Sequence, residues 1–152
     1  MNFLVGTATW EEVLPIWRDN LWPGRTSAIE PTSAIKYLGG YDMQNMQFVP
    51  VFFSVRSDRI IAVNSIVQCA DGSARSRGLW VDPEYRKAGY ARIVLECSIL
   101  QAKDWKSSHI WTMPRATALP AYQSVGFIQT SDWFDQGVEF GPNCYASRRI
   151  DV

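Results

Sequence analysis

The sequence predicts a mixed α/β domain, and three observations lead to that fold class. Residues 48–56 and 59–69 are rich in Val, Ile and Phe and are separated by two turn residues, which is typical of a β-hairpin. Residues 88–105 have helical character and lie between two expected strands, so at least one connection is a parallel crossover. The chain has 152 residues, 47% apolar and 20% charged, which suits a single domain over residues 1–152 with a proper core.

The N-terminal part is expected to hold a short strand, residues 2–7, followed by two helices. Thr9 is a suitable N-cap for the first helix because two glutamates follow it in the first turn. This helix continues as a rough apolar stripe until Pro23 and Gly24 end it. Residues 30–38 are expected to form the second helix, with a proline near its start and two glycines after its end.

After the hairpin, a turn at residues 71–72 leads to a third strand over residues 73–81, which Pro83 ends. The helix over residues 88–105 is expected to be amphipathic and to lie against the sheet. It has a polar face (Arg92, Glu96, Lys103) and an apolar face (Tyr90, Ile93, Val94, Cys97, Leu100).

The C-terminal part is expected to add a strand, a helix and a hairpin. Residues 109–113 form the short strand, and residues 116–125 form a helix that Pro120 breaks or starts. Residues 127–134 and 144–150 are expected to pair as a closing hairpin.

Composition excludes several classes of function. Fifteen basic and fifteen acidic residues cancel without a run of like charge, so nothing indicates a nucleic-acid partner. The start of the chain lacks a basic segment, and its apolar stretches fall far short of the ~18 to 20 residues of a membrane span, so we expect a cytoplasmic protein with no membrane partner. Cys69, Cys97 and Cys144 are odd in number and widely spaced, so we expect buried free thiols, and with His109 as the single histidine we expect no metal site.

The most informative stretch is residues 79–91, LWVDPEYRKAGYA, where a strand end, a proline, a basic pair and a small-residue turn lead into a helix. Backbone N–H groups at a helix start have no intrahelical partner and favour an anion. Gly89 lets phosphate oxygens approach the main chain. Residues 75–92 hold five basic and two acidic side chains, whereas both flanking parts of the chain are net negative. The pattern favours a phosphate or pyrophosphate, with an ordinary solvated loop as the alternative.

Two motifs in this region resemble the GNAT superfamily of N-acetyltransferases. The first, V-x-P-x-Y-R-x-x-G-x-A, resembles that superfamily's acetyl-CoA pyrophosphate loop, and the second, A-x-x-x-Y-x-x-x-G-F, follows at the expected distance. The matching residues are Val81, Pro83, Tyr85, Arg86, Gly89 and Ala91, then Ala118, Tyr122, Gly126 and Phe127. The resemblance is strong from residue 79 to 127 and weak over residues 1–47, and it implies a central mixed, mostly antiparallel twisted sheet flanked by helices.

By this resemblance the cosubstrate is acetyl-CoA. The main chain of Leu79, Trp80 and Val81 would pair with the pantetheine arm where two parallel strands diverge, near Val81 and Met113. The Val81 N–H would point at the thioester carbonyl, and Tyr122 would be the general acid that protonates the departing thiolate. The alternative for Tyr122 is an aromatic side chain of the core. The N–H groups that would hold the pyrophosphate belong to Arg86, Lys87, Ala88, Gly89, Tyr90 and Ala91.

The chain departs from the family pattern at two places. Arg115 stands where an asparagine is usual, and a contact of Arg115 with the pantetheine or the adenine side of the cofactor is left open. Residues 73–80 contain no acid, although many family members supply a glutamate base from this strand. Either water relays the proton, or Glu30, Asp132 or Asp135 supplies the base. For each of these three, a surface carboxylate is the favoured interpretation.

The acceptor is the least defined part of the prediction. Residues 131–140 carry three acids among three aromatic side chains, which would attract an ammonium group or simply form a solvated hairpin. The resemblance implies transfer of an acetyl group to a primary amine by direct attack in a ternary complex. A small-molecule amine is favoured because no long acidic stretch suits a basic peptide. A protein N-terminal or lysine acceptor, a non-catalytic CoA-binding module and a homodimer stay open.

Overall fold

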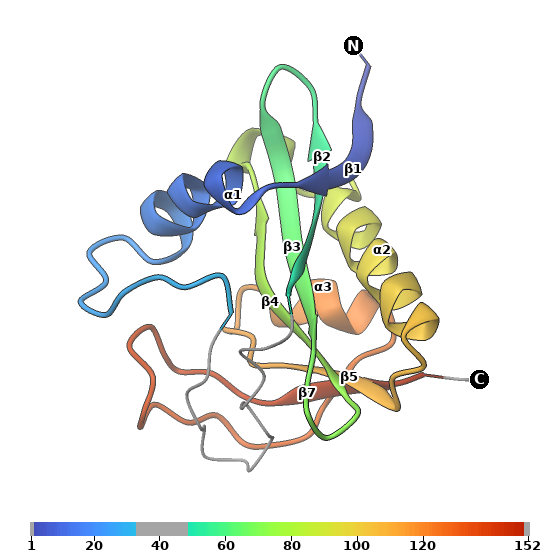
Figure 1. The fold of residues 1–152 in the computed structure, drawn as a ribbon. Helices are drawn as coiled ribbons and strands as arrows, with labels where there is room; N and C mark the ends of the chain where they lie inside the picture. Colours follow the sequence, from blue (N-terminus) through green and yellow to red (C-terminus); the bar gives the residue numbers. More distant parts are fainter. Residues whose placement is uncertain (1, 33–48, 151–152) are drawn as a thin grey trace.

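The computed structural model describes residues 2–32 and 49–150 of the chain. Their strands form one sheet with helices on both faces (Figure 1). The strands are β1 (Leu4–Ala8), β2 (Val51–Arg56), β3 (Ile60–Gln68), β4 (Ala74–Val81), β5 (His109–Thr112), β6 (Ile128–Gln129) and β7 (Ala146–Arg149), and the helices are α1 (Trp10–Ile16), its π-helical continuation η1 (Trp17–Leu21), the 3-10 turn η2 (Pro83–Tyr85), α2 (Tyr90–Asp104) and α3 (Leu119–Ser124).

The sheet has the strand order β1-β2-β3-β4-β5-β7-β6. Every neighbouring pair is antiparallel except β4 and β5, which run parallel and are joined through α2. The predicted mixed, mostly antiparallel sheet with a helical crossover is therefore confirmed. The two predicted hairpins are present as well, although β6 pairs with β7 over only two residues.

The helices cover opposite faces of the sheet because side chains alternate along each strand. On β3, Val63 packs into the cluster that α1 covers, together with Phe52 and Trp80. The next residue, Asn64, faces the other way and bonds to Ser98 of α2. The larger core lies on the α2 side, where α2 and α3 pack together over β3, β4 and β5.

The first helix begins where the sequence predicts it. Thr9 is its N-cap and forms a capping box with Glu12: the Glu12 N–H donates to the Thr9 hydroxyl at 3.2 Å, and the Thr9 N–H donates to the Glu12 carboxylate at 3.0 Å. Arg56 of β2 pairs with the same carboxylate at 2.8 Å. One glutamate thus fixes both the start of α1 and its position on the sheet.

The predicted apolar face of α2 is wrong at one end. Leu100 is 64% exposed, whereas Ser98 and Ala102 are buried. Which residues of α2 are buried depends on the side of the helix on which they lie and not on whether they are apolar. Small side chains on the buried side let the helix approach the sheet closely. The residues buried on α2 are Val94, Leu95, Ser98, Ile99 and Ala102.

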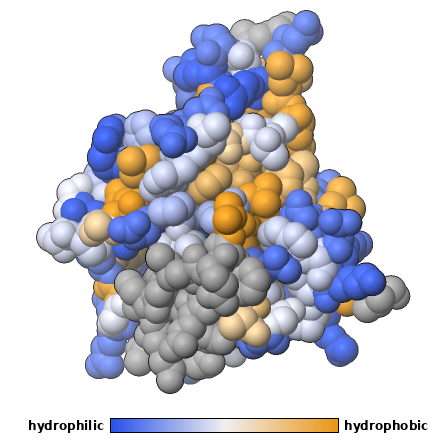
Figure 2. Space-filling view, viewed as in Figure 1, coloured by the Kyte–Doolittle hydropathy of each residue, from blue (hydrophilic) through white to orange (hydrophobic). Residues whose placement is uncertain are grey.

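Two further predictions concern the N-terminal region. The helix expected over residues 30–38 lies, from residue 33 on, outside the described residues. The expected strand at the start is present as β1, an edge strand whose other side has no neighbour among the described strands. Its Leu4 and Val5 are exposed, and Figure 2 shows hydrophobic atoms gathered on this side of the molecule. The homodimer stays a prediction.

Candidate active site

The parallel strands β4 and β5 diverge soon after they meet. Their pairing is limited to Ala74 with Ile110 and Arg75 with Trp111. Beyond this point the Thr112 hydroxyl donates to the Ser76 carbonyl at 3.0 Å, and a cavity of about 250 Å³ opens between the strands. The divergence that the resemblance implied is thus present. The cavity is lined by both strands, by α3, by the segment after η1 and by residues 137–140.

A β-bulge in β4 places main chain at the cavity wall. Gly78 and Leu79 together oppose the single residue Asn64 of β3, and both line the cavity. Gly78 has a φ of +79°, and its carbonyl accepts the Trp17 indole N–H at 3.0 Å. A β-carbon at Gly78 would overlap the Trp17 ring. The bulge therefore needs glycine both for its conformation and for its contact with α1's continuation.

The register beyond the bulge directs the Val81 N–H away from β3. The Asp82 N–H donates to the Ile61 carbonyl at 2.7 Å, and N–H groups alternate in direction along an antiparallel strand. The Val81 carbonyl points the same way as its N–H and accepts a bond from Arg86 Nε at 3.2 Å. The Val81 N–H therefore lies on the side from which β5 has diverged. By the same alternation, the Trp80 N–H faces β3.

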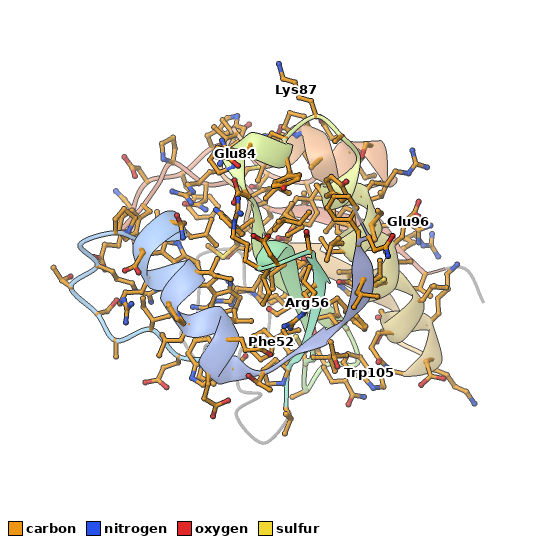
Figure 3. The ribbon with its side chains drawn as sticks, turned by 90° about the horizontal axis from the view of Figure 1, so that it is seen from above. Phe52, Arg56, Glu84, Lys87, Glu96 and Trp105 are labelled. Carbon is orange, nitrogen blue, oxygen red and sulfur yellow. The ribbon has the colours of Figure 1, made fainter. Side chains whose placement is uncertain are left out.

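The loop between β4 and α2 has the backbone geometry of an anion-binding turn. Lys87 and Gly89 both have left-handed conformations, with φ of +62° and +88°, and such turns gather successive N–H groups around a concavity. In the described part of the chain, no hydrogen bond uses the N–H of Gly89, Tyr90 or Ala91. Figure 3 shows the Lys87 side chain extending away from the body of the molecule.

Two carboxylates precede this loop in the sequence, and both pair with the same arginine. Arg59 of β3's leading turn bonds to Asp82 at 3.0 Å and to Glu84 at 3.2 Å. The pKa of Asp82 is lowered, first by the Glu84 N–H and then by Arg59. The free N–H groups at the start of α2 lie at the positive end of the helix dipole and favour an anion.

Tyr122 of α3 reaches the cavity from the larger core and is only 2% exposed. Its hydroxyl lies 2.8 Å from the hydroxyl of Ser76. A buried chain of hydrogen bonds continues from Ser76 to Asn64 and from Asn64 to Ser98. Burial raises the pKa of Tyr122 above its ordinary value, and hydrogen bonds to Ser76 and Thr112 oppose this only in part. The phenol is therefore protonated at neutral pH. The polar chain on which it depends was not foreseen from the sequence.

The other unforeseen feature is the charge of the cavity wall. Among the residues that the structure describes, four arginines line it, Arg25, Arg75, Arg77 and Arg115, and one carboxylate, Glu139. Arg115, left open as a cofactor contact, donates to the Leu21 carbonyl at 3.2 Å, and burial lowers its pKa. The alternation of Arg75, Ser76 and Arg77 along one strand was the available signal, because alternate side chains of β4 share a face.

None of the three acids considered as a base lines the cavity. Glu30, Asp132 and Asp135 are all exposed side chains. Glu139 does line it, but the Thr26 N–H, which bonds to Glu139 at 2.6 Å, lowers the pKa of this carboxylate. A carboxylate with a lowered pKa is a weak base. Glu139 instead ties residues 137–140 to the segment after η1.

The remaining sequence candidates lie away from the cavity. His109 opens β5 at the end opposite the divergence, and its Nδ1 lies 2.9 Å from the Ser108 hydroxyl. Cys69 and Cys144 are buried, as expected, and Cys97 is half-buried.

Comparison with known proteins assigns the family. Residues 50–129 match the acetyltransferase (GNAT) domain, so the chain belongs to the GNAT family of acetyltransferases. The GNAT fold binds CoA or acetyl-CoA. No curated protein sequence matches the chain. In the part of the chain that the structure describes, no helix has the length and apolar character needed to cross a membrane.

Solved structures share the fold, in whole or in part, at low sequence identity. An acetyltransferase of the GNAT family from Staphylococcus aureus is 13% identical with a TM-score of 0.68, over 99% of this chain and 100% of that one. The ribosomal-protein-S18-alanine N-acetyltransferase from Escherichia coli is 15% identical with a TM-score of 0.67, over 99% and 96%. An acetyltransferase from Bacillus subtilis, solved in complex with CoA, is 14% identical with a TM-score of 0.55, over 66% and 77%.

Proposed function

We propose that this GNAT acetyltransferase, acting as one domain over residues 1–152, transfers the acetyl group of acetyl-CoA to a primary amine of a small molecule. The observation that carries the proposal is the cavity at the divergence of β4 and β5, which is lined by both the β4 main chain and the Tyr122 phenol. The segment after η1 and residues 137–140 both line this cavity, and hydrogen bonds from Thr26 to Glu139 tie them together. A cavity of about 250 Å³ suits a small acceptor better than a protein tail.

The cofactor is proposed to lie along the side of β4 that faces away from β3, where β5 has diverged. The free N–H groups at residues 89–91, with those of Arg86, Lys87 and Ala88, hold the pyrophosphate at the positive end of α2. The pantetheine arm then follows β4 into the gap, where Leu79 lines the cavity and the Val81 N–H is directed away from β3. Trp80 lies between Leu79 and Val81 in the same strand, and Arg115 lines the same cavity.

The reaction needs no covalent enzyme intermediate. The neutral amine attacks the thioester carbonyl, the C–S bond breaks, and the products are an amide and the CoA thiol. The Val81 N–H is directed to the carbonyl oxygen, where negative charge develops. Tyr122 gives its proton to the departing sulfur, and the proton released from the attacking nitrogen leaves through water. The absence of acid from residues 73–80 agrees with a water relay.

The test is a coupled assay of binding and turnover. Acetyl-CoA should raise the melting temperature of the protein, and mixing with a panel of small primary amines should release free thiol. Binding without thiol release from any small amine, but with release from peptides, would identify a protein acceptor. Binding without release from either would identify a non-catalytic CoA-binding module.

A further inference from the structure

The buried chain of hydrogen bonds that reaches Tyr122 has a definite direction. At its far end, on α2, the Ser98 hydroxyl donates its one proton to the Val94 carbonyl at 2.8 Å. Ser98 can therefore only accept in its 2.9 Å contact with the Asn64 side-chain nitrogen. This contact orients the Asn64 amide, so that its oxygen faces the Ser76 hydroxyl at 3.0 Å. The Ser76 proton is thus directed to Asn64.

A second hydroxyl beside the phenol directs its proton elsewhere in the same way. Thr112 of β5 donates to the Ser76 carbonyl at 3.0 Å, and its oxygen, like that of Ser76, is a hydrogen-bond partner of Tyr122. Both hydroxyls therefore present lone pairs to the phenol, which suits its protonated form. Ser76 lowers the pKa of Tyr122 only by turning its proton toward the phenolate. That turn breaks the hydrogen bond from Ser76 to Asn64.

Burial makes this exchange of partners costly. Asn64 is 0% exposed and Ser76 is 1% exposed. A polar atom in such surroundings that loses its partner finds no bulk water to replace it. When Ser76 turns, the Asn64 oxygen loses the proton that it accepted. Asn64 and a Tyr122 phenolate thus compete for one proton, and the competition opposes ionisation of the phenol.

We infer that Asn64 is a positioning residue for the general acid: by accepting the Ser76 proton, it keeps the Tyr122 phenol protonated until the departing thiolate takes the phenol's proton. The inference rests on the proposed function for the role of Tyr122. Asn64 does not belong to the cavity lining in the described part of the chain, so it acts through Ser76. Loss of Asn64 should therefore ease ionisation of Tyr122, whereas loss of Ser76 should hinder it.

The test follows ionisation of Tyr122 by NMR in the protein without ligand, with tyrosine labelled with carbon-13 at the ζ position. Asn64→Leu keeps the branched shape of the side chain but cannot accept a proton. It should move the midpoint of the Tyr122 titration to lower pH by about one unit. In a Ser76→Ala background the same change should have no effect. A midpoint at or above that of the parent in Asn64→Leu would overturn the inference, and so would an equal shift in the Ser76→Ala background.

The charged side chains that line the cavity with Tyr122 are unchanged in all these variants, so their effect on its pKa cancels in the comparison. They are Arg25, Arg75, Arg77, Arg115 and Glu139. Among them, Arg75 lowers the pKa of Tyr122.

A matched control is Ser65→Ala, next to Asn64 on β3. Ser65 is 2% exposed, and its hydroxyl donates to the Arg77 carbonyl at 2.6 Å, outside the buried chain. The control should leave the midpoint in place. Should Asn64→Leu not fold, Ser98→Ala decides instead. It keeps Asn64 but removes the oxygen that orients the amide, so the Ser76 proton can turn to the phenol and the midpoint should again fall.

Thiol release separates this inference from the proposed function. In Asn64→Leu the loss of kcat at high pH should begin at lower pH than in the parent, in step with the NMR midpoint. If no amine releases thiol but the midpoint moves as expected, the proposed reaction fails and the control of Tyr122 by Asn64 stands. If thiol is released and the midpoint does not move, the reaction stands and the role of Asn64 is refuted.

Discussion

The hydroxyl of Tyr122 donates its proton to the hydroxyl of Ser76, 2.8 Å away, in the interior of the protein. The direction of this hydrogen bond follows from the other hydrogen bonds of the buried network. Ser98 donates to the Val94 carbonyl, so Asn64 must donate its amide proton to Ser98 and accept the Ser76 proton on its oxygen. Ser76 then has only a lone pair left for Tyr122. To protonate a thiolate, the phenol turns its proton into the cavity, and Ser76 can turn its own toward the phenolate.

Tyr122→Phe is expected to slow thiol release by about 100-fold or more, since it removes the general acid. The affinity for acetyl-CoA should change little, because the ring and its packing on Phe127 remain. Stopped-flow thiol detection and calorimetry measure the two quantities. The control is Tyr145→Phe, a buried tyrosine outside the cavity lining. An unchanged rate of thiol release in the Tyr122 variant would show that Tyr122 is not the general acid.

Ser76→Ala tests Ser76 as a positioning residue. The Ser76 hydrogen bond opposes the rise in the pKa of Tyr122 that burial causes, so its loss should move this pKa further up. We expect kcat to fall about tenfold with KM for acetyl-CoA unchanged. In the unmodified protein the loss of kcat due to Tyr122 ionisation should begin only above pH ~10. Ser76→Thr should recover part of the rate, which a purely structural defect does not predict.

Gly89→Ala tests the conformation of the loop. Gly89 and Gly72 have φ of +88° and +87°, and no atom of the described residues lies within 4 Å of a β-carbon built at either. Both alanine variants should lose about 1 kcal/mol of stability, because alanine disfavours this conformation. Gly89→Ala alone should weaken acetyl-CoA binding, by about tenfold. Equal acetyl-CoA affinity in the two variants would contradict a role of the loop in binding.

Glu12 is expected to account for part of the loss of folding stability at low pH. Its hydrogen bond with Arg56, followed by that with the Thr9 N–H, lowers its pKa from 4.5 to about 2. A carboxyl whose folded pKa is lowered contributes stability above its unfolded value and loses it as the pH falls through the folded one. Unfolding by urea at pH 5 and pH 3 should therefore show a smaller loss in Glu12→Gln than in the parent. Glu11→Gln, in the same turn, should behave as the parent does.

Local features of the sequence predicted most of the fold. The hairpin of β2 and β3, the Thr9 cap and the crossover through α2 depend on neighbouring residues, on turn chemistry and on strand propensity. The start of α2 at Gly89 is also where the small-residue turn placed it. Such signals lie within a few residues of one another, so they can be recognised in a single sequence.

The cavity wall could not be predicted in this way. Arg25, Arg77 and Arg115 come from distant parts of the chain and meet only because β4 and β5 diverge. The bulge at Gly78 also shifts the alternation of β4, so a simple two-residue pattern fails there. Burial of arginine opposes its usual preference and left no trace in the composition. Of the three acids in residues 131–140, the segment considered as one that attracts an ammonium group, only Glu139 lines the cavity.

The most direct test follows the backbone amides of the loop by NMR during titration with acetyl-CoA and, separately, with S-acetylpantetheine, which lacks the pyrophosphate. Acetyl-CoA should shift the amide signals of Gly89, Tyr90 and Ala91, and S-acetylpantetheine should leave them in place while shifting Leu79. If saturating acetyl-CoA leaves these three signals unchanged, the coenzyme is held elsewhere and the account of the site is wrong.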